Sequence, residues 1–228
     1  MEYLHNGFTI TTADGAFPIS TDSMVLAHAA SPGKNARILD LGSGCGTLGL
    51  LLCAQNPGCL VTGIEIDENA HRCAVVNIQR NGLSGRLESI CADLRTIPQI
   101  FPAGSFSACI SNPPYFTAGP ESSLKQARRE DTCSMDELFC AADWAVQYGG
   151  DFHLVHRPER FAQLCATAAA HHFEVKQVLL LRHRPDGPIT LILAKCRKGG
   201  KAGLVWEENS LYNNDGTPTE YYRQVYHL

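Results

Sequence analysis

The sequence predicts an α/β fold with a mainly parallel sheet, closed by an antiparallel hairpin and preceded by a short N-terminal extension. Apolar runs of strand length alternate with helical segments, the pattern typical of β-α-β units. A glycine-rich loop joins the first of these strands to its helix, and only a turn separates the last two long apolar runs. The 228 residues are enough for one sizeable core.

The first 35 residues are expected to form the extension, and residues 36–228 the main domain. Residues 8–10 and 17–19 are predicted to be two short strands around a turn. A helix then runs to about Ala30, before a Ser-Pro-Gly-Lys-Asn segment ends it. Three side chains at its start could cap it: Ser20, Thr21 and Asp22.

The main domain should contain seven strands and four principal helices. The strands are expected at residues 36–41, 60–66, 85–91, 106–110, 150–155, 175–183 and 189–196. The helices are expected at residues 47–55, 68–80, 134–146 and 156–171. Ser134 opens the third helix with a capping-box pattern, and a proline- and glycine-containing turn between the last two strands predicts the hairpin.

Composition and spacing exclude several classes of protein. There is no apolar run of membrane-spanning length and no basic-then-apolar leader, so neither a membrane span nor a secretory signal is expected. The ten cysteines include no C-x-x-C pair and the nine histidines no H-x₃-H pair, which favours cytoplasmic thiols and no metal site. Oligomeric state stays open, with a monomer favoured.

The formal net charge of −4 argues against wholesale coating of nucleic acid. The segment from Arg182 to Lys201 is an exception, because its charged side chains are basic apart from Asp186. It could form a local basic face that holds a nucleic acid transiently, or simply a solvated hairpin rim.

The loop Gly42-Ser43-Gly44-Cys45-Gly46 is the first candidate ligand site. Alternating glycines between a strand and a helix let a ligand approach the backbone and leave the helix N-terminus exposed. A dinucleotide loop would read G-x-G-x-x-G, whereas here Asp40 stands two residues before the first glycine. Its charge repels a diphosphate and suits a cationic amino acid group. NAD binding and a turn without ligand remain alternatives.

Two acidic residues follow the next two strands. Glu65 ends the second strand, about twenty positions beyond the glycines, where an acid is placed to bind ribose hydroxyls. Asp93 follows the third strand and could cap a short turn before Ile97. The opening third of the chain is therefore predicted to be a β-α-β nucleoside-binding unit.

The stretch Ser111-Asn112-Pro113-Pro114-Tyr115 follows the fourth strand, at the sheet edge where open α/β folds bind ligands. Successive prolines fix φ and remove backbone donors, so the carbonyls of Asn112 and Pro113 remain free to accept. The Asn112 oxygen, a free carbonyl and the Tyr115 ring suit a planar group that bears an NH₂. The alternative is a strand-ending turn with a core tyrosine.

Residues 116–133 are polar and predict a mobile lid over this site. Arg128 and Arg129 could hold phosphates, or could pair with Glu130 and Asp131 on a solvated surface.

Together these motifs resemble the class I methyltransferases that use S-adenosylmethionine. The pattern from Asp40 to Gly46 is similar to their D/E-x-G-x-G-x-G motif, and Asn112 to Tyr115 resembles the (N/D)PP(Y/F) signature of amino-group methyltransferases. Further similarity at residues 17–27, 127–130 and 156–160 and in the tyrosine-containing tail is to the tRNA1(Val) adenine-37 N6-methyltransferase family. The resemblance covers nearly the whole chain and implies a Rossmann-like, seven-stranded sheet.

The resemblance also implies residue roles. Asp93 would accept from the adenine amino group of the cofactor. The implied cofactor-binding residues are Thr21, Asp22, Asp40, Gly42, Gly44, Gly46, Glu65, Ile66, Asp93, Leu94 and Asn112. The implied catalytic residues are Asn112, Pro113, Pro114 and Tyr115. The residues expected to face RNA are Tyr115, Lys125, Arg128, Arg129 and Arg157, and no metal is implied.

The expected reaction is S-adenosylmethionine-dependent N6-methylation of an adenine in RNA, with A37 of a tRNA anticodon loop as the favoured target. Accepting both hydrogens of the adenine amino group at Asn112 and Pro113 would favour a tetrahedral nitrogen. Tyr115 would stack on the displaced base. The alternatives are an rRNA or DNA amino-methyltransferase, a release-factor glutamine N5-methyltransferase, an NAD-linked oxidoreductase, and a cofactor-binding module without catalysis.

Overall fold

The computed structural model describes residues 2–3, 7–12, 19–113 and 133–228. The strands are β1 (Glu2–Tyr3), β2 (Thr9–Ile10), β3 (Arg37–Leu41), β4 (Leu60–Glu65), β5 (Leu87–Cys91), β6 (Phe106–Ser111), β7 (Val146–His156), β8 (Phe173–Arg182), β9 (Ile189–Lys198) and β10 (Val205–Ser210). The helices are α1 (Thr21–Ala30), α2 (Thr47–Gln55), α3 (Glu68–Arg80), α4 (Ile97–Ile100), α6 (Met135–Ala145), α7 (Phe161–Ala170) and α8 (Glu220–Tyr226), with short 3-10 turns η2 (Leu94–Thr96) and η3 (Pro158–Arg160).

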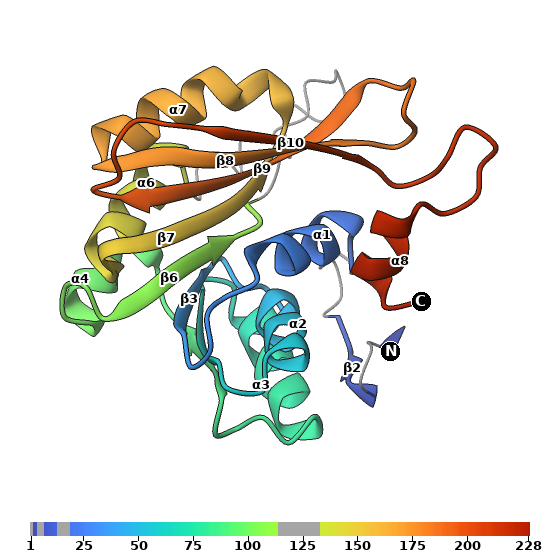
Figure 1. Cartoon of the computed structure of the whole chain (residues 1–228). Coiled ribbons are helices and arrows are strands. Elements are labelled where there is room, and N and C mark those ends of the chain that lie inside the picture. The colour runs from blue at the N-terminus through green and yellow to red at the C-terminus, as the bar shows by residue number, and fades with distance from the viewer. Residues whose placement is uncertain (1, 4–6, 13–18, 114–132) are drawn as a thin grey trace, which may run out of the picture.

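The main sheet has the strand order β10-β8-β9-β7-β6-β3-β4-β5 (Figure 1). Strands β5, β4, β3, β6 and β7 are parallel neighbours, whereas β9 is antiparallel to both β7 and β8. This arrangement confirms the predicted α/β class and the antiparallel hairpin. The carboxyl ends of β3, β4 and β6 therefore meet at one edge of the sheet, which brings the glycine loop, Glu65 and Asn112 together.

The predicted number of strands was wrong, because the main sheet has eight. The additional strand is β10, which pairs in parallel with β8 at the edge of the sheet. Its sequence, Val-Trp-Glu-Glu-Asn-Ser, is largely exposed and has no buried apolar face. The apolar pattern that identifies a buried strand is therefore missing from it.

The first strand of the predicted N-terminal hairpin is present as β2, and its partner among the described residues is β1. Strand β2 pairs with β1 in antiparallel register, with Tyr3 opposite Thr9, and Ile19 lies outside any strand. Residues 13–18, which include the rest of the predicted second strand, lie outside the described residues. The helix predicted up to Ala30 is confirmed as α1, and the Ser20 hydroxyl caps it by accepting from the Ser23 amide.

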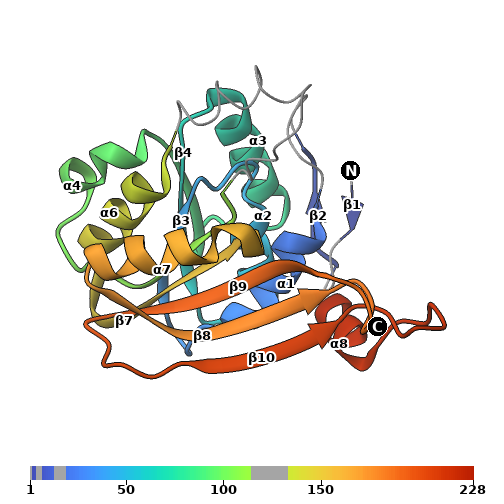
Figure 2. The ribbon, with the colours of Figure 1, turned by 90° about the horizontal axis from the view of Figure 1, so that it is seen from above.

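Two apolar clusters cover the two faces of the sheet (Figure 2). Alternate residues of one strand supply them, so that Ile38 faces the cluster with α1, α2 and α3, whereas Leu39 faces the cluster with α4, α6 and α7. The buried side of α1, which includes Val25 and Leu26, is part of the first cluster. The N-terminal helix therefore packs into the same core as the main domain.

The helices predicted at residues 47–55 and 68–80 are confirmed as α2 and α3. The predicted capping box is present at the start of α6, where the Ser134 and Glu137 side chains each accept from the other's backbone amide. All ten cysteines carry free thiols. None of the helices in the described ranges combines the length and the apolar character needed to cross a bilayer.

Candidate active site

The glycine loop turns sharply at the carboxyl end of β3. Gly42, Gly44 and Gly46 have φ of 72°, 54° and 83°, in the left-handed region that glycine adopts without strain. The amides of Gly42 and Ser43 both donate to the Ile64 carbonyl at 3.0 Å, which fixes the loop against β4. The loop is thus preformed, with helix α2 beginning directly after it.

A buried asparagine on α3 holds this loop through side-chain hydrogen bonds. The Asn77 side chain is fully buried and its Nδ2 donates to the Cys45 carbonyl at 3.0 Å and to the Thr11 carbonyl at 2.8 Å. Its Oδ1 accepts from the Thr11 amide at 2.9 Å. Cys45 is itself buried. The N-terminal segment, α3 and the glycine loop are therefore held as one unit.

Glu65 joins the glycine loop to the end of β4. Its Oε2 accepts from the Gly44 amide at 2.7 Å and its Oε1 accepts from the Asp67 amide at 2.8 Å. The carboxylate is half-buried, and each oxygen keeps a lone pair for another donor. Glu65 can therefore position the loop and bind a pair of ribose hydroxyls together.

Asp40 is a buried carboxyl with no hydrogen-bond partner at either oxygen among the described residues. Its side chain is 1% exposed. Burial and then the charge of Glu65 raise the pKa of Asp40 to about 8. A cation above the loop would favour the ionised form. Asp40 can therefore complement a cationic group placed above the loop.

Asn112 follows β6 and is held by the start of α1. Its Nδ2 donates to the Ser23 hydroxyl at 3.0 Å, and Ser23 Oγ lies 3.3 Å from Ser20 Oγ. With the NH₂ group occupied, Oδ1 is the free end of the amide, and no described residue donates to it. Ser111 fixes the preceding position, because its hydroxyl donates to the Leu41 carbonyl at 2.8 Å.

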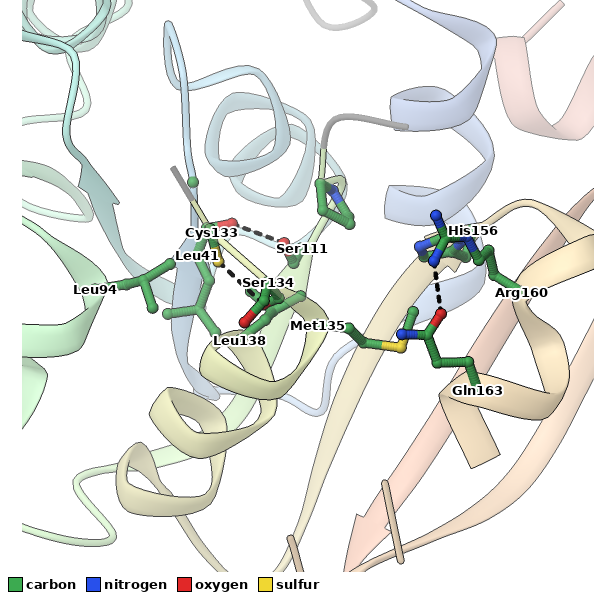
Figure 3. A pocket seen from close by; sticks show the side chains of 12 residues that line it. Leu41, Leu94, Ser111, Cys133, Ser134, Met135, Leu138, His156, Arg160 and Gln163 are labelled. Atoms are coloured by element: carbon green, nitrogen blue, oxygen red, sulfur yellow. Dashed lines mark hydrogen bonds between the residues drawn. The ribbon is translucent and has the colours of Figure 1, made fainter. Parts of the chain in front are cut away.

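A cavity of about 200 Å³ lies beside Asn112, between the carboxyl ends of β3 and β6 and the helices α6 and α7 (Figure 3). Leu94 and Leu138 form its apolar end, and Arg160 and Gln163, which are hydrogen-bonded to each other at 2.8 Å, form its polar end. The full lining is Leu41, Gly42, Leu94, Ser111, Pro113, Cys133, Ser134, Met135, Leu138, His156, Arg160 and Gln163. An apolar wall with a polar end suits a flat, partly polar ring.

Residues 8–178 match the family described as "Methyltransferase small domain". The chain belongs to this methyltransferase family. It is 30% identical over 184 residues to the tRNA1(Val) (adenine(37)-N6)-methyltransferase of Bacteroides fragilis. The alignment covers 79% of this chain and 77% of that protein. It is 32% identical over 183 residues to the protein of the same name from Shewanella halifaxensis. That alignment covers 79% of this chain and 74% of that protein.

Among solved structures, a "predicted O-methyltransferase" from Agrobacterium tumefaciens shares the fold, with a TM-score of 0.76 at 22% identity over 91% of this chain and 96% of that one. The predicted resemblance to the tRNA1(Val) adenine-37 N6-methyltransferase family is confirmed by the two sequence relatives. The match to methyltransferases removes the NAD-linked oxidoreductase alternative.

The remaining residues predicted to bind the methyltransferase cofactor lie around the same edge. The Asp93 side chain caps η2 by accepting from the Arg95 amide, and its hydrogen bonds with the Arg95 guanidinium hold its pKa below the ordinary value. Leu94 lines the cavity, and Ile66 is 51% exposed beyond β4. The Asp93 cap, which the sequence analysis left open, is therefore present.

The two predicted residues at the start of α1 have different surroundings. Thr21 Oγ1 lies 3.0 Å from the Tyr226 hydroxyl of α8, which ties the C-terminal helix to α1. Asp22 lies in the first turn of α1 and is engaged in interactions of its own. Ser23, one residue further, was missed by the sequence analysis, which considered the Ser-Thr-Asp-Ser run only as helix caps and family matches.

Arg157 was predicted to face RNA, and the structure shows that its side chain also bonds to the sheet. Its guanidinium donates to the Thr190 carbonyl of β9 at 3.1 Å. Its neighbours His156 and Arg160 line the cavity instead, and the sequence analysis did not assign them to the site. His156 Nδ1 accepts from the Arg157 amide at 2.8 Å, and burial lowers the pKa of His156, which favours the neutral ring.

The basic segment from Arg182 to Lys201 does not form one basic face. Arg182 pairs with Glu208 at 2.5 Å, whereas Lys195 and Arg197 both pair with Asp151, at 3.2 Å and 2.8 Å. The segment runs from the end of β8 through the whole of β9. Its basic residues therefore lie near opposite ends of these two strands. Charge counted along the sequence could not show this separation.

Several predicted site residues lie outside the described residues. These are Pro114, Tyr115, Lys125, Arg128 and Arg129, together with most of the predicted lid at 116–133. Within the described part of the chain, no three His, Cys, Asp or Glu side chains gather as a metal site would require.

Proposed function

We propose that this protein transfers a methyl group from S-adenosylmethionine to N6 of an adenine in RNA, with A37 of a tRNA anticodon loop as the target. The observation that carries the proposal is the orientation of the Asn112 side chain. Its Nδ2 donates to the Ser23 hydroxyl, which leaves the amide oxygen available to accept a hydrogen bond beside the glycine loop and the cavity. The names of the two sequence relatives support the tRNA substrate. We expect the enzyme to be cytoplasmic, because its tRNA substrate is found there. The free thiols agree with that location.

The residues that would hold S-adenosylmethionine surround the glycine loop. Asp40 would complement its cationic end, Glu65 would accept from its ribose hydroxyls, and Asp93 and Leu94 would contact its adenine. The cofactor supplies a methyl group already activated on a sulfonium. The protein therefore has to align a nitrogen with that carbon rather than generate a strong nucleophile.

The exocyclic nitrogen of adenine is a poor nucleophile, because its lone pair is delocalised into the ring. Asn112 Oδ1 and the Pro113 carbonyl would each accept one of its hydrogens, which favours a tetrahedral nitrogen with its lone pair localised and directed at the methyl carbon. The nitrogen becomes cationic and acidic only after transfer, so its proton can then leave to water. Tyr115 would stack on the base, which is unpaired in an anticodon loop.

The test is incubation with isotopically methyl-labelled S-adenosylmethionine and total tRNA that lacks modifications, followed by nucleoside mass spectrometry. We expect N6-methyladenosine, located at position 37 by ribonuclease mapping. Label in an rRNA, in DNA or in the glutamine of a release-factor peptide, with none in tRNA, would instead select one of the other amino-methyltransferase activities.

Ser23→Ala is expected to lower the turnover number about tenfold, because the Asn112 amide loses the bond that orients it. The affinity for S-adenosylmethionine should stay within about twofold, since Ser23 Oγ bonds the Asn112 amide and does not contact the glycine loop. Steady-state kinetics and calorimetry measure the two effects.

Two controls separate this positioning role from helix stability. Ser20→Ala removes the N-cap of α1 without removing the Asn112 bond, so it should lower the melting temperature more than the turnover. In an Asn112→Ala background, Ser23→Ala should have no further effect on turnover. An equal loss in both backgrounds would show that Ser23 acts by another route.

Binding of S-adenosylmethionine at pH 7 is expected to release close to one proton from Asp40. With a pKa of about 8, the carboxyl is mainly protonated at pH 7 in the free protein, and a bound cation would ionise it. At a pH well above 8 the carboxyl is already ionised, so the release should disappear. Calorimetry in buffers of different ionisation enthalpy measures the number of protons.

Asp40→Asn should abolish this proton release, whereas Asp186→Asn on the exposed hairpin should leave it unchanged. Proton release that persists in Asp40→Asn would assign the titration to a different group.

A further inference from the structure

A second cavity, of about 490 Å³, lies at the opposite edge of the sheet from Asn112. The loop that follows α1 forms one wall, and the beginnings of β3 and β6 with parts of β7 and β9 form the other. Its charged and polar lining includes Lys34, Arg37, Gln147, His153 and Lys195. None of these residues belongs to the site proposed for methyl transfer.

The lining is strongly basic for a chain of net charge −4. Among the described residues, neither Lys34 nor Arg37 has an acidic partner. The Arg37 guanidinium lies 5.7 Å from the centre of the Phe106 ring, which supports it at the cavity. Lys195 lies 3.2 Å from Asp151, the only acidic residue in the lining.

Asp151 is also bound by Arg197, through contacts of 2.8 Å and 3.0 Å to its two oxygens. Its negative charge is therefore shared between Arg197 and Lys195. With three cationic side chains and one carboxylate, the lining carries a net charge of +2.

His153 lines the same cavity and is 8% exposed. It stands opposite Lys195 in the register of β7 and β9. No described residue forms a hydrogen bond with its ring. Burial lowers the pKa of His153 to about 4, so at pH 7 the ring is neutral and keeps one N–H to donate. This N–H can donate to an acceptor atom of a ligand bound in the cavity.

We propose that this cavity binds a small phosphate monoester of the sugar phosphate class. A phosphate monoester carries about −1.5 to −2 charges at pH 7, which matches the net charge of the lining. Arg37 can bind two of the three terminal phosphate oxygens at once, and Lys34 and the His153 N–H can both donate to the third.

The size and composition of the cavity favour a sugar over a nucleotide base. Small-molecule sites usually have volumes of about 300–1,000 Å³, and the cavity lies in that range. Its described lining includes Ser31, Asn35, Ser105 and Gln147, which can bind hydroxyl groups, and contains no Phe, Tyr or Trp on which a base could stack. The ligand is therefore distinct from both adenines of the methyl-transfer reaction.

The test is calorimetric titration of the full chain with ribose 5-phosphate at constant ionic strength, with ribose as the uncharged control. The informative variant is Lys34→Gln with Arg37→Gln. The matched control is Arg184→Gln with Lys201→Gln, which removes the same charge from exposed positions outside the cavity.

We expect binding of ribose 5-phosphate and none of ribose, with affinity at least about tenfold weaker in the cavity variant and unchanged in the control. The NMR signal of the His153 ring, identified by its loss in His153→Gln, should shift on binding. Saturating S-adenosylmethionine should not compete, so the result is independent of the proposed methyl transfer. Equal affinity in both double variants, displacement by S-adenosylmethionine, or binding of RNA alone would each overturn the proposal.

Discussion

Asn112→Ala is expected to reduce the turnover number by at least about a hundredfold, because it removes one of the two acceptors for the adenine amino group. The loss should appear in kcat rather than in cofactor binding, since the Asn112 side chain bonds to Ser23 and not to the glycine loop. Affinity for S-adenosylmethionine should change by no more than about twofold. Single-turnover kinetics with tRNA and calorimetry with the cofactor measure the two quantities.

Asn214→Ala provides the matched control, because Asn214 is exposed in the segment before α8. It should retain full turnover. Asn112→Asp should also be impaired, although its carboxylate can accept, because it cannot donate to the Ser23 hydroxyl as the amide does. Retained turnover in Asn112→Ala would remove this residue from the chemistry and leave the glycine loop as a binding site only.

Glu65→Ala is expected to weaken S-adenosylmethionine binding by at least about a hundredfold. Two effects combine, because the variant loses an acceptor for the ribose and also leaves the Gly44 and Asp67 amides without their partner. Hydrogen bonds to a charged group contribute about 1.5–3 kcal/mol each, so the loss of two supports an effect of this size. Calorimetry measures the affinity, and hydrogen exchange at the Gly44 amide measures the loosening of the loop.

Glu65→Gln separates the two effects, since it keeps the length of the side chain but only one carbonyl oxygen to accept. Its affinity should lie between those of the wild type and Glu65→Ala. Glu88→Ala, an exposed glutamate on β5, removes the same charge and should bind the cofactor normally. If Glu65→Ala bound S-adenosylmethionine as tightly as the wild type, the cofactor could not lie along the ends of β3 and β4.

The local elements of this protein could be predicted because local chemistry determines them. Helices α2 and α3 begin and end where the apolar spacing indicated, and the capping box at Ser134 forms within four consecutive residues. The glycine loop was recognisable for a similar reason, since its three left-handed positions require glycine. Strand β10 was missed because an exposed edge strand needs no apolar face.

The sequence by itself therefore determined the α/β class, the positions of the core strands along the chain, the glycine loop and the identity of the amide that follows β6. Only the tertiary structure showed that Ser23 holds Asn112 across 89 positions of sequence, and that Asp40 is buried with no hydrogen-bond partner in the described part of the chain. It also separated Arg182, at the end of β8, from Lys195 and Arg197, at the far end of β9. It gathered Lys34, Arg37 and His153 around one cavity. The physical reason is that propensity, capping and turn chemistry act over a few residues, whereas desolvation and side-chain pairing depend on segments that meet only when the sheet assembles.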